Sequence, residues 1–246
     1  AAGYTTALIA HGSDVRDPHR HIEINGKWSM YLAGDAEWRA DLARAARLHR
    51  AVAESSGSPV FYSTPDLRLD LEGGTWLPVC LDVNAWGTDA PLLERAQPRV
   101  LHIPSKRTPP IKGTQFVDPV LRKLDDAGKI EYVCPESVPH SEMRSLVHDV
   151  DIVVDQLLAG SYGVAAIEAM SAGRVTVGRL APPVLDLMPE APPIVQATPD
   201  ELEETIVAIV EDRDHYRRLG REGINFAHIW HSGKASATAL RGYLER

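Results

Sequence analysis

Two stretches decide the fold of this chain: Val100-Leu-His-Ile-Pro-Ser-Lys-Arg-Thr-Pro-Pro-Ile-Lys-Gly113 and Gly160-Ser-Tyr-Gly-Val-Ala-Ala-Ile-Glu-Ala-Met-Ser-Ala-Gly-Arg-Val-Thr-Val-Gly-Arg179. Each contains a small, polar or basic turn that lies between a predicted strand and a predicted helix. In α/β proteins, turns at the carboxyl ends of parallel strands are the places where anionic ligands bind. Two such turns that converge would hold a diphosphate.

Around these turns, strands and helices alternate regularly through the second half of the chain. The pattern predicts strands at 99–103, 130–134, 151–155, 174–177 and 193–196, and helices at 113–127, 140–150, 162–172 and 199–212. Strands separated by helices form a parallel sheet that is covered on both faces. We therefore expect a doubly wound, Rossmann-like α/β domain, followed by two terminal helices.

The first 98 residues predict a smaller α/β region. Apolar runs at 5–10, 59–63 and 75–81 predict strands, and Asp35 is placed to cap a helix that runs to residue 55. The apolar positions of this helix recur at helical spacing and predict its buried face: Trp38, Leu42, Ala45, Leu48 and Val52.

Three strands are too few for a whole doubly wound domain and leave an exposed sheet edge. Two explanations stay open: the chain is part of a longer protein, or another chain covers the edge. The sequence starts Ala-Ala-Gly rather than with Met, which favours a trimmed chain or a fragment. We expect three regions: a partial N-terminal α/β domain (1–98), a C-terminal ligand-binding domain (99–228), and a C-terminal helix (229–246) that packs back on the N-terminal part.

Composition narrows the class of protein. The 246 residues carry a formal net charge of -8, which argues against a general nucleic-acid binder. There is no apolar run near the roughly 20 residues that span a bilayer, and no secretory signal. Cys80 and Cys134 lie in apolar, strand-like runs and predict buried free thiols. We expect a cytoplasmic protein.

The basic turn offers Arg107 and Lys112, with Lys112 at the start of a predicted helix. A cation at a helix N-terminus opposes the helix dipole. The arrangement makes sense if an anion lies between the cations and the helix amides. The alternative, a solvated loop with two surface charges, stays open at this point.

The second turn is rich in glycine. Gly160 and Gly163 let the backbone approach a ligand closely, and the amides of Tyr162, Gly163 and Val164 would point at it from the helix start. Glu168 follows among small apolar neighbours, where a carboxylate is costly unless it accepts hydrogen bonds. Sugar hydroxyls would supply them, unless Glu168 lies on a solvent-facing side of the helix.

Other kinds of site find little support. His11, His19 and His21 with the neighbouring Asp14 and Asp17 match no tight metal-ligand spacing, so we predict no metal site. The chain has no Walker loop, no dinucleotide-binding glycine fingerprint and no nucleophile elbow.

The two turns together resemble the donor-binding domain of GT-B-fold glycosyltransferases of family four (glycosyl transferases group 1). In that family an Arg and, five residues later, a Lys hold the donor diphosphate, and Arg107 and Lys112 match both identity and spacing. Glu168 matches the second Glu of the family's Glu-x7-Glu motif, which binds the nucleotide ribose. His11 resembles the acceptor-domain His that faces the donor sugar. The resemblance covers nearly the whole chain.

The resemblance implies a GT-B-like fold and a function. It implies transfer of a sugar, with retention and without a metal or other cofactor, from a nucleotide-diphosphate sugar to an unknown sugar, lipid or small-molecule acceptor. His11, Arg107 and Lys112 would be catalytic. The donor-binding residues would be Gly160, Tyr162, Gly163, Val164 and Glu168.

One departure from the family leaves alternatives open. Gly160 stands where the family has its first Glu, which contacts the transferred sugar. Asp155 and Gln156 are candidates to replace that Glu. A catalytically deficient accessory subunit that binds a nucleotide sugar is the main alternative function, and a GT-B-fold sugar epimerase is a weaker one.

Overall fold

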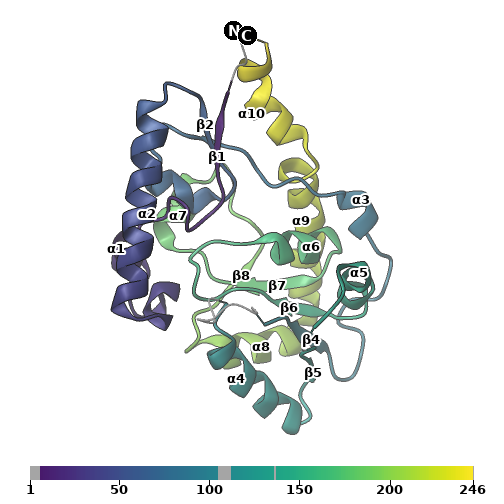
Figure 1. The fold of residues 1–246 in the computed structure, drawn as a ribbon. Coiled ribbons are helices and arrows are strands. Elements are labelled where there is room, and N and C mark those ends of the chain that lie inside the picture. The colour runs from purple at the N-terminus through teal and green to yellow at the C-terminus, as the bar shows by residue number, and fades with distance from the viewer. Residues whose placement is uncertain (1–5, 105–111, 136, 246) are drawn as a thin grey trace.

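The computed structural model describes residues 6–104, 112–135 and 137–245. Within them, two parallel sheets lie one above the other in Figure 1, each with helices packed around it. The described helices are α1 (Pro18–Asn25), α2 (Ala36–Ser55), α3 (Val83–Trp86), α4 (Thr114–Asp126), α5 (His140–His148), α6 (Val164–Ser171), α7 (Pro182–Leu187), α8 (Leu202–Glu211), α9 (Arg213–Trp230) and α10 (Lys234–Leu244). Short 3-10 turns lie at Gly26–Trp28, Met30–Ala33 and Pro65–Leu69.

The larger sheet has the strand order β5-β4-β6-β7-β8. Its strands are β4 (Arg99–His102), β5 (Glu131–Val133), β6 (Ile152–Val154), β7 (Val175–Gly178) and β8 (Val195–Gln196). Every described pair of neighbouring strands is parallel, and the strand order reverses between β4 and β6. The predicted doubly wound α/β domain is confirmed, and its switch point lies between the two quoted turns.

Helices cover both faces of this sheet, which explains why the central strand β6 is apolar and buried at every position. Ile152 and Val154 face the helices α4 and α8, where the core includes Leu121 and Ile206. Val153 faces the opposite way, into a second apolar cluster under α5 and α6. The rigid sheet therefore fixes the place where β6 ends and the loop to α6 begins.

Helix α6 is held against the long helix α9 by a very close approach. A methyl group at Gly220 would lie 2.6 Å from the Gly173 carbonyl oxygen, and one at Gly223 would lie 3.3 Å from Met170. Because only glycine leaves room for this contact, the two glycines of α9 set the position of α6.

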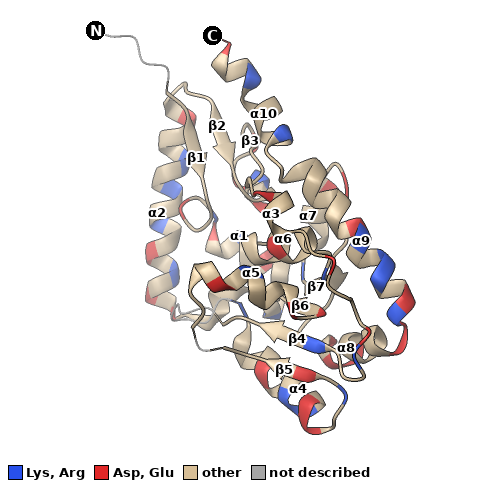
Figure 2. Ribbon diagram, turned by 90° about the vertical axis from the view of Figure 1, so that its right-hand side faces the viewer, with Lys and Arg blue, Asp and Glu red and all other residues tan. Residues whose placement is uncertain are grey.

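The smaller sheet contains β1 (Leu8–Ala10), β2 (Val60–Tyr62) and β3 (Thr75–Trp76), in that order. Figure 2 shows it running from β1, beside α2, to β3, beside α10. The strand predicted at 75–81 is shorter than expected, since Pro78 has no backbone N–H to give to a sheet. Within the described residues β1 has a strand on one side only, as the predicted open edge requires.

Helix α2 begins where predicted, because Asp35 accepts a hydrogen bond from the Trp38 amide at 2.8 Å. Its buried face was predicted only in part. Trp38 and Leu42 pack, partly buried, against the cluster that contains Met30 and Tyr31. The fully buried positions are Ala43, Ala46 and Ala53, whereas Leu48 is 62% exposed and Val52 is 50% exposed. Val52 lines a hollow beside β1 together with Ile9, which is 48% exposed.

The C-terminal helix α10 lies against the smaller sheet. Tyr243 packs edge-on against Phe61 of β2, and the Ser236 hydroxyl donates to the Pro78 carbonyl at 2.6 Å. Trp76 of β3 stacks on Trp230 of α9 with 5.2 Å between the ring centroids. The end of the chain thus joins the two sheets, while the exact domain boundaries stay a prediction.

Two smaller predictions concern the cysteines and membranes. Both thiols are free, but Cys80 is exposed and Cys134 is half-buried, so the prediction of buried thiols was wrong. Cys80 lies in the irregular segment between β3 and α3, outside any sheet. In the described ranges, every helix is too short or too polar to cross a membrane.

Candidate functional site

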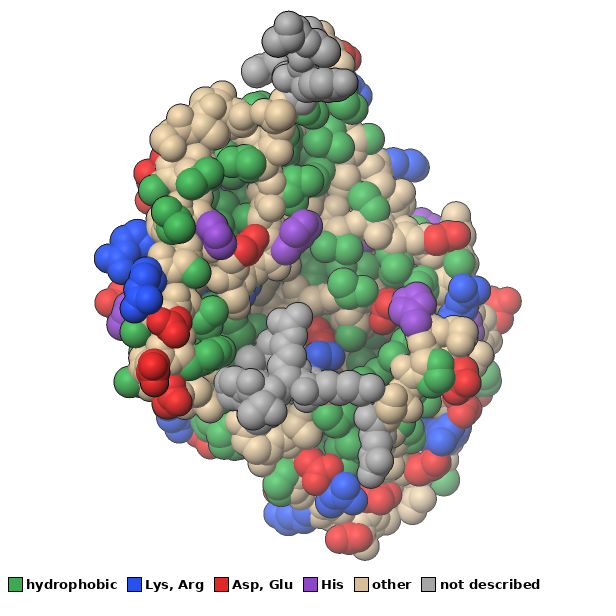
Figure 3. Space-filling view, viewed as in Figure 1, with side chains coloured by type: hydrophobic (Ala, Val, Ile, Leu, Met, Phe, Trp, Pro, Cys, Tyr) green, Lys and Arg blue, Asp and Glu red, His purple; other side chains and the backbone are tan. Residues whose placement is uncertain are grey.

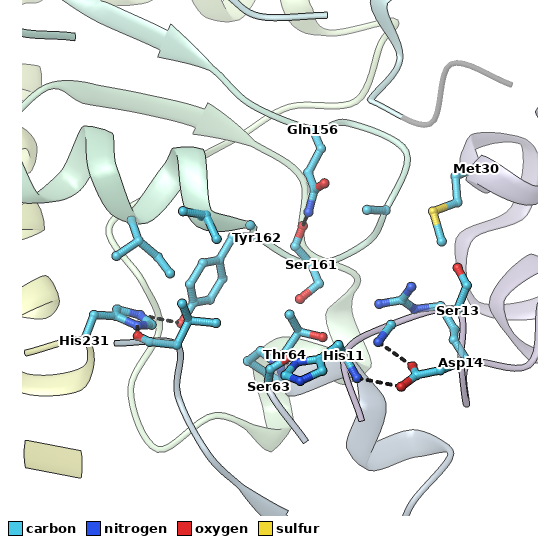
Figure 4. A pocket seen from close by; sticks show the side chains of 18 residues that line it. His11, Ser13, Asp14, Met30, Ser63, Thr64, Gln156, Ser161, Tyr162 and His231 are labelled. Carbon is cyan, nitrogen blue, oxygen red and sulfur yellow. Dashed lines mark hydrogen bonds between the residues drawn. The ribbon is translucent and has the colours of Figure 1, made fainter. Parts of the chain in front are cut away.

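A cleft of about 610 Å³ separates the two halves of the molecule. Figure 3 shows this face, hollowed between the two sheets. The cleft is lined by His11, Gly12, Ser13, Asp14, Arg16, Met30, Ser63, Thr64 and Pro65 from the N-terminal half, by Gln156, Ala159, Ser161, Tyr162, Gly163, Val164 and Ile167 from the C-terminal half, and by Val79 and His231. In Figure 4, Gln156 and Ser161 lie between Tyr162 and His231 on one side and Met30, Ser13 and Asp14 on the other.

At the switch point of the larger sheet, the two predicted turns meet. Lys112 Nζ lies 3.4 Å from Asp155 Oδ1, and the Gly163 amide donates to Asp155 Oδ2 at 3.3 Å. The two turns are also joined through the backbone, because the Leu157 amide donates to the Lys112 carbonyl at 3.2 Å. The structure therefore brings Lys112 to the start of α6. Arg107, the other predicted cation, lies outside the described residues.

Gly163 has no side chain that could cap α6, and Asp155 is the described side chain that contacts the start of this helix, through the Gly163 amide. Gly163, its N-cap, has extended backbone, and a methyl group there would touch Gln156 and Asp155. Val164, the first helical residue, is 47% exposed and lines the cleft. Free amides at a helix start attract anions.

Glu168 is buried, with only 6% of its surface exposed. Burial raises the pKa of its carboxyl group to about 7; the charge of Asp155 adds to the effect and Lys112 opposes it. The alternative of a solvent-facing Glu168 is therefore wrong. Near neutral pH this side chain is divided between its protonated and ionised forms, so it can either donate or accept a hydrogen bond.

Tyr162 is fixed by a chain of hydrogen bonds. Its hydroxyl lies 3.1 Å from His231 Nε2, and His231 Nδ1 lies 2.8 Å from the Val79 carbonyl oxygen. Burial lowers the pKa of His231 to about 4, so the ring is neutral at neutral pH. Since a carbonyl only accepts, Nδ1 carries the proton and Tyr162 donates to Nε2. This chain ties the start of α6 to α9 and to the segment between the sheets.

Of the predicted donor-binding residues, Tyr162, Gly163 and Val164 line the cleft, whereas Glu168 and Gly160 do not. Gly160 has a φ of +64°, and a methyl group on it would lie 2.3 Å from Asn25 Oδ1. Asn25 itself is held by Arg179, whose guanidinium donates to the same Oδ1 at 2.8 Å. A larger side chain at position 160 has neither the backbone conformation nor the space that it needs.

His11 stands at the end of β1 and lines the N-terminal wall. Its backbone amide donates to Asp14 Oδ2 at 2.9 Å, and the Gly12 amide donates to Asp14 Oδ1 at 2.7 Å. The ring is not used in these contacts. The structure thus places His11 in the same cleft as Gly163 and Val164, on the opposite wall.

The sequence analysis missed a buried ion pair in that wall. Arg16 contacts Asp66 at 2.7 Å, and both side chains are buried. Burial works against the charge of Arg16, but Asp66 holds the pKa of its guanidinium above the usual value. Arg16 and Asp66 follow the carboxyl ends of neighbouring parallel strands, and this position in the sequence is the signal by which they could have been found.

The hydroxyls of Thr64 and Ser161 lie beside Asp66. Burial works to raise the pKa of the Asp66 carboxyl group, but Arg16 and these two hydroxyls lower it overall. Thr64 Oγ1, Ser161 Oγ and Asp66 Oδ1 are buried, and none of them makes a hydrogen bond of good geometry within the described chain. Thr64 and Ser161 line the cleft from opposite halves. Over the same residues, there is no group of three or more His, Cys, Asp or Glu side chains arranged to hold a metal ion.

The chain was compared with known proteins. Neither a protein-family model nor a curated protein sequence matches it. Among solved structures, Anabaena HepE in complex with UDP-glucose is similar, with a TM-score of 0.64 and 13% identity over 98% of this chain and 72% of HepE. Sucrose-phosphate synthase from Thermosynechococcus elongatus has a TM-score of 0.61 and 14% identity, over 96% of this chain and 67% of the synthase.

A third similar structure is TarM, with a TM-score of 0.55 and 15% identity over 82% of this chain and 45% of TarM. All three are glycosyltransferases of the GT-B type. With identities this low, the likeness concerns the fold alone. The chain is an α/β protein with a GT-B-like arrangement of two parallel sheets.

Proposed function

We propose that the protein is a glycosyltransferase that transfers a sugar from a nucleotide-diphosphate sugar to a hydroxyl-bearing acceptor. The observation that carries the proposal is the meeting of Lys112 with the start of α6 at Asp155. It occurs at the switch point of a doubly wound sheet, beside a cleft between two parallel sheets. The similar HepE structure contains UDP-glucose, a ligand of the proposed class.

In this proposal the diphosphate of the donor binds between Lys112 and the first amides of α6. Negative charge grows on the diphosphate as the bond to the sugar breaks, and preorganised cations and amides stabilise it. Arg107 would assist as the second cation. Because these groups supply the charge compensation, the reaction needs no divalent metal.

Glu168 would bind the nucleotide ribose. It lies on the second turn of α6, behind the proposed diphosphate position, and is buried. A ribose diol both donates and accepts hydrogen bonds, which suits a carboxyl group that is divided between two protonation states near pH 7.

The sugar would lie in the cleft between His11 and the start of α6, and the reaction would retain the configuration of the anomeric carbon. The acceptor, a sugar, lipid or small molecule, would enter along the N-terminal wall. That wall offers the hydroxyls of Ser13 and Ser63, which suit a polar, neutral acceptor.

One observation favours a second candidate function, a nucleotide-sugar-binding accessory subunit without transfer activity. Gly160 is pressed against Asn25, so this position has no room for the carboxylate that contacts the transferred sugar in family four. Gln156 is the better placed of the two candidates for replacing it, because it lines the cleft; its amide donates to the Ser161 carbonyl at 2.8 Å.

Two measurements test the proposal. Calorimetry with UDP, GDP and ADP should detect binding of at least one of them, and the donor sugar of the bound nucleotide should then be hydrolysed slowly in the absence of an acceptor. Binding without any hydrolysis or transfer supports the accessory subunit instead. If none of the three nucleotides binds, both functions are refuted.

A further inference from the structure

Asp155 lies at the position where the donor diphosphate is expected. Its side chain comes directly after β6 and reaches the start of α6. One carboxylate oxygen is 3.4 Å from Lys112 Nζ, and the other accepts the Gly163 amide at 3.3 Å. A cation and a helix-start amide are the partners that a phosphate group uses.

These contacts leave much of the hydrogen-bonding capacity of the Asp155 carboxylate unused. Asp155 is 3% exposed, and Oδ1 makes no hydrogen bond within the described chain, although it lies close to Lys112. The Gly163 hydrogen bond is longer than the 2.7–2.9 Å typical of charge-assisted bonds. A buried carboxylate with such weak contacts is easily replaced by an anion that fits better.

The surrounding charges do not favour a second anion beside Asp155. Besides burial, the charge of Asp155 raises the pKa of Glu168, so the two carboxylates repel each other. His102 is kept neutral by burial and is engaged by the Val154 carbonyl and the Thr114 hydroxyl. Among the described groups, Lys112 is therefore the cation for which Asp155 and an incoming phosphate would compete.

We infer that Asp155 is an internal anion that occupies the phosphate position, and that a nucleoside diphosphate binds by taking Lys112 and the Gly163 amide away from it. The inference rests on the proposed function. It assigns Asp155 a role in turnover, because after transfer the carboxylate can recover both partners and so help to release the nucleoside diphosphate. Release of product limits the rate of many enzymes.

The replacement Asp155→Asn tests the inference, since it keeps an oxygen that can accept the Gly163 amide and removes the charge. Calorimetry with UDP, GDP and ADP should show binding that is tighter on the order of tenfold than in the wild type, because one repelling charge at close range is removed. The exposed Asp126→Asn is the control and should leave affinity unchanged. Asp155→Ser, also neutral, serves if the first variant does not fold.

The outcomes separate the inference from the proposed function. Tighter binding by the neutral variants supports the inference, also when the wild type itself binds too weakly to measure. If the wild type binds a nucleotide and the neutral variants bind equally or more weakly, the inference is refuted and the proposed function stands. If neither the wild type nor a folded neutral variant binds any of the three, both are refuted.

Discussion

The two halves of the molecule face each other across the cleft with different chemistry. The C-terminal half presents a cation and a helix start on a five-stranded sheet whose central strands are buried on both faces. The N-terminal half presents hydroxyls, His11 and the closed ion pair Arg16–Asp66, on short strands with an open edge. The rigid half is thus suited to a charged ligand of fixed geometry, and the other half to a neutral one.

The largest effect is expected at the centre of the rigid half. Lys112→Ala removes the cation that would stabilise the departing diphosphate, and turnover should fall roughly 100-fold or more. The fold should survive because Lys112 is partly exposed, but the melting temperature should fall, since the buried carboxylate of Asp155 loses its cation. Initial rates of transfer and a thermal melt measure the two effects.

The matched control is Lys129→Ala, because Lys129 is exposed in the turn between α4 and β5. It should keep wild-type turnover. Full activity of the Lys112→Ala variant would show that the C-terminal half does not use the charge of Lys112 to bind or activate the donor.

The next effect concerns the contact between the halves at Gly160. Gly160→Glu introduces a side chain at a φ of +64° and against Asn25, and should lower the free energy of unfolding by about 3 kcal/mol. Gly57→Glu is its control: Gly57 has a φ of +65° but nothing within 4 Å of its missing methyl group, so only about 1 kcal/mol of backbone strain is expected.

Urea denaturation of the two variants measures the difference, which isolates the contact with Asn25. Equal losses of stability would mean that the halves are not pressed together at this point. A stable Gly160→Glu variant with increased transfer activity would contradict the account of this position given above.

A smaller effect should depend on pH. The pKa of Glu168 is about 7 in the folded protein, against about 4.5 for an exposed glutamate, so the folded state holds the proton more tightly. Stability should therefore fall as pH rises from about 4.5 to 7, by on the order of 2 kcal/mol after allowance for solvent screening. Glu168→Gln should abolish this decline and be more stable than the wild type at pH 8.

Urea denaturation at pH 5 and pH 8 measures the effect, with the exposed Glu222→Gln as control. A variant that keeps the wild-type pH dependence would show that Glu168 titrates normally.

The smallest effect is expected at the open edge of the N-terminal half. Val52→Ala should cost less than about 0.5 kcal/mol, because Val52 is half exposed, whereas Val175→Ala in the larger sheet should cost about 2 kcal/mol. Chemical denaturation of both variants measures the contrast. A large loss at Val52 would indicate that a further segment or a second chain covers this edge in solution.

Much of the rigid half could be predicted from the sequence. Regular alternation of strands and helices leads to a doubly wound sheet, and the rule for carboxyl ends brings the turns of Lys112 and Gly163 together. These inferences succeed because they depend on local periodicity and on a general property of parallel sheets. The burial of Glu168 was foreseen only as one of two alternatives.

The contacts between the halves could not be predicted in the same way. Asn25 meets Gly160 across 135 positions of sequence, and Arg16 meets Asp66 across 50, with no local pattern that links the partners. The buried face of α2 was predicted only in part, because its apolar stripe was read without the surface it packs on. Trp38 and Leu42 make contact, but alanines are fully buried where Leu48 and Val52 were expected. Such details depend on tertiary packing.

The stacked pair Trp76–Trp230 joins β3 of the N-terminal half to α9 of the C-terminal half. Indole rings at this distance couple their electronic transitions, and the circular dichroism that results depends on their mutual orientation. The pair is therefore an intrinsic spectroscopic probe of the arrangement of the two halves. A ligand that turns one half against the other would alter the circular dichroism and the tryptophan emission, with no dye attached.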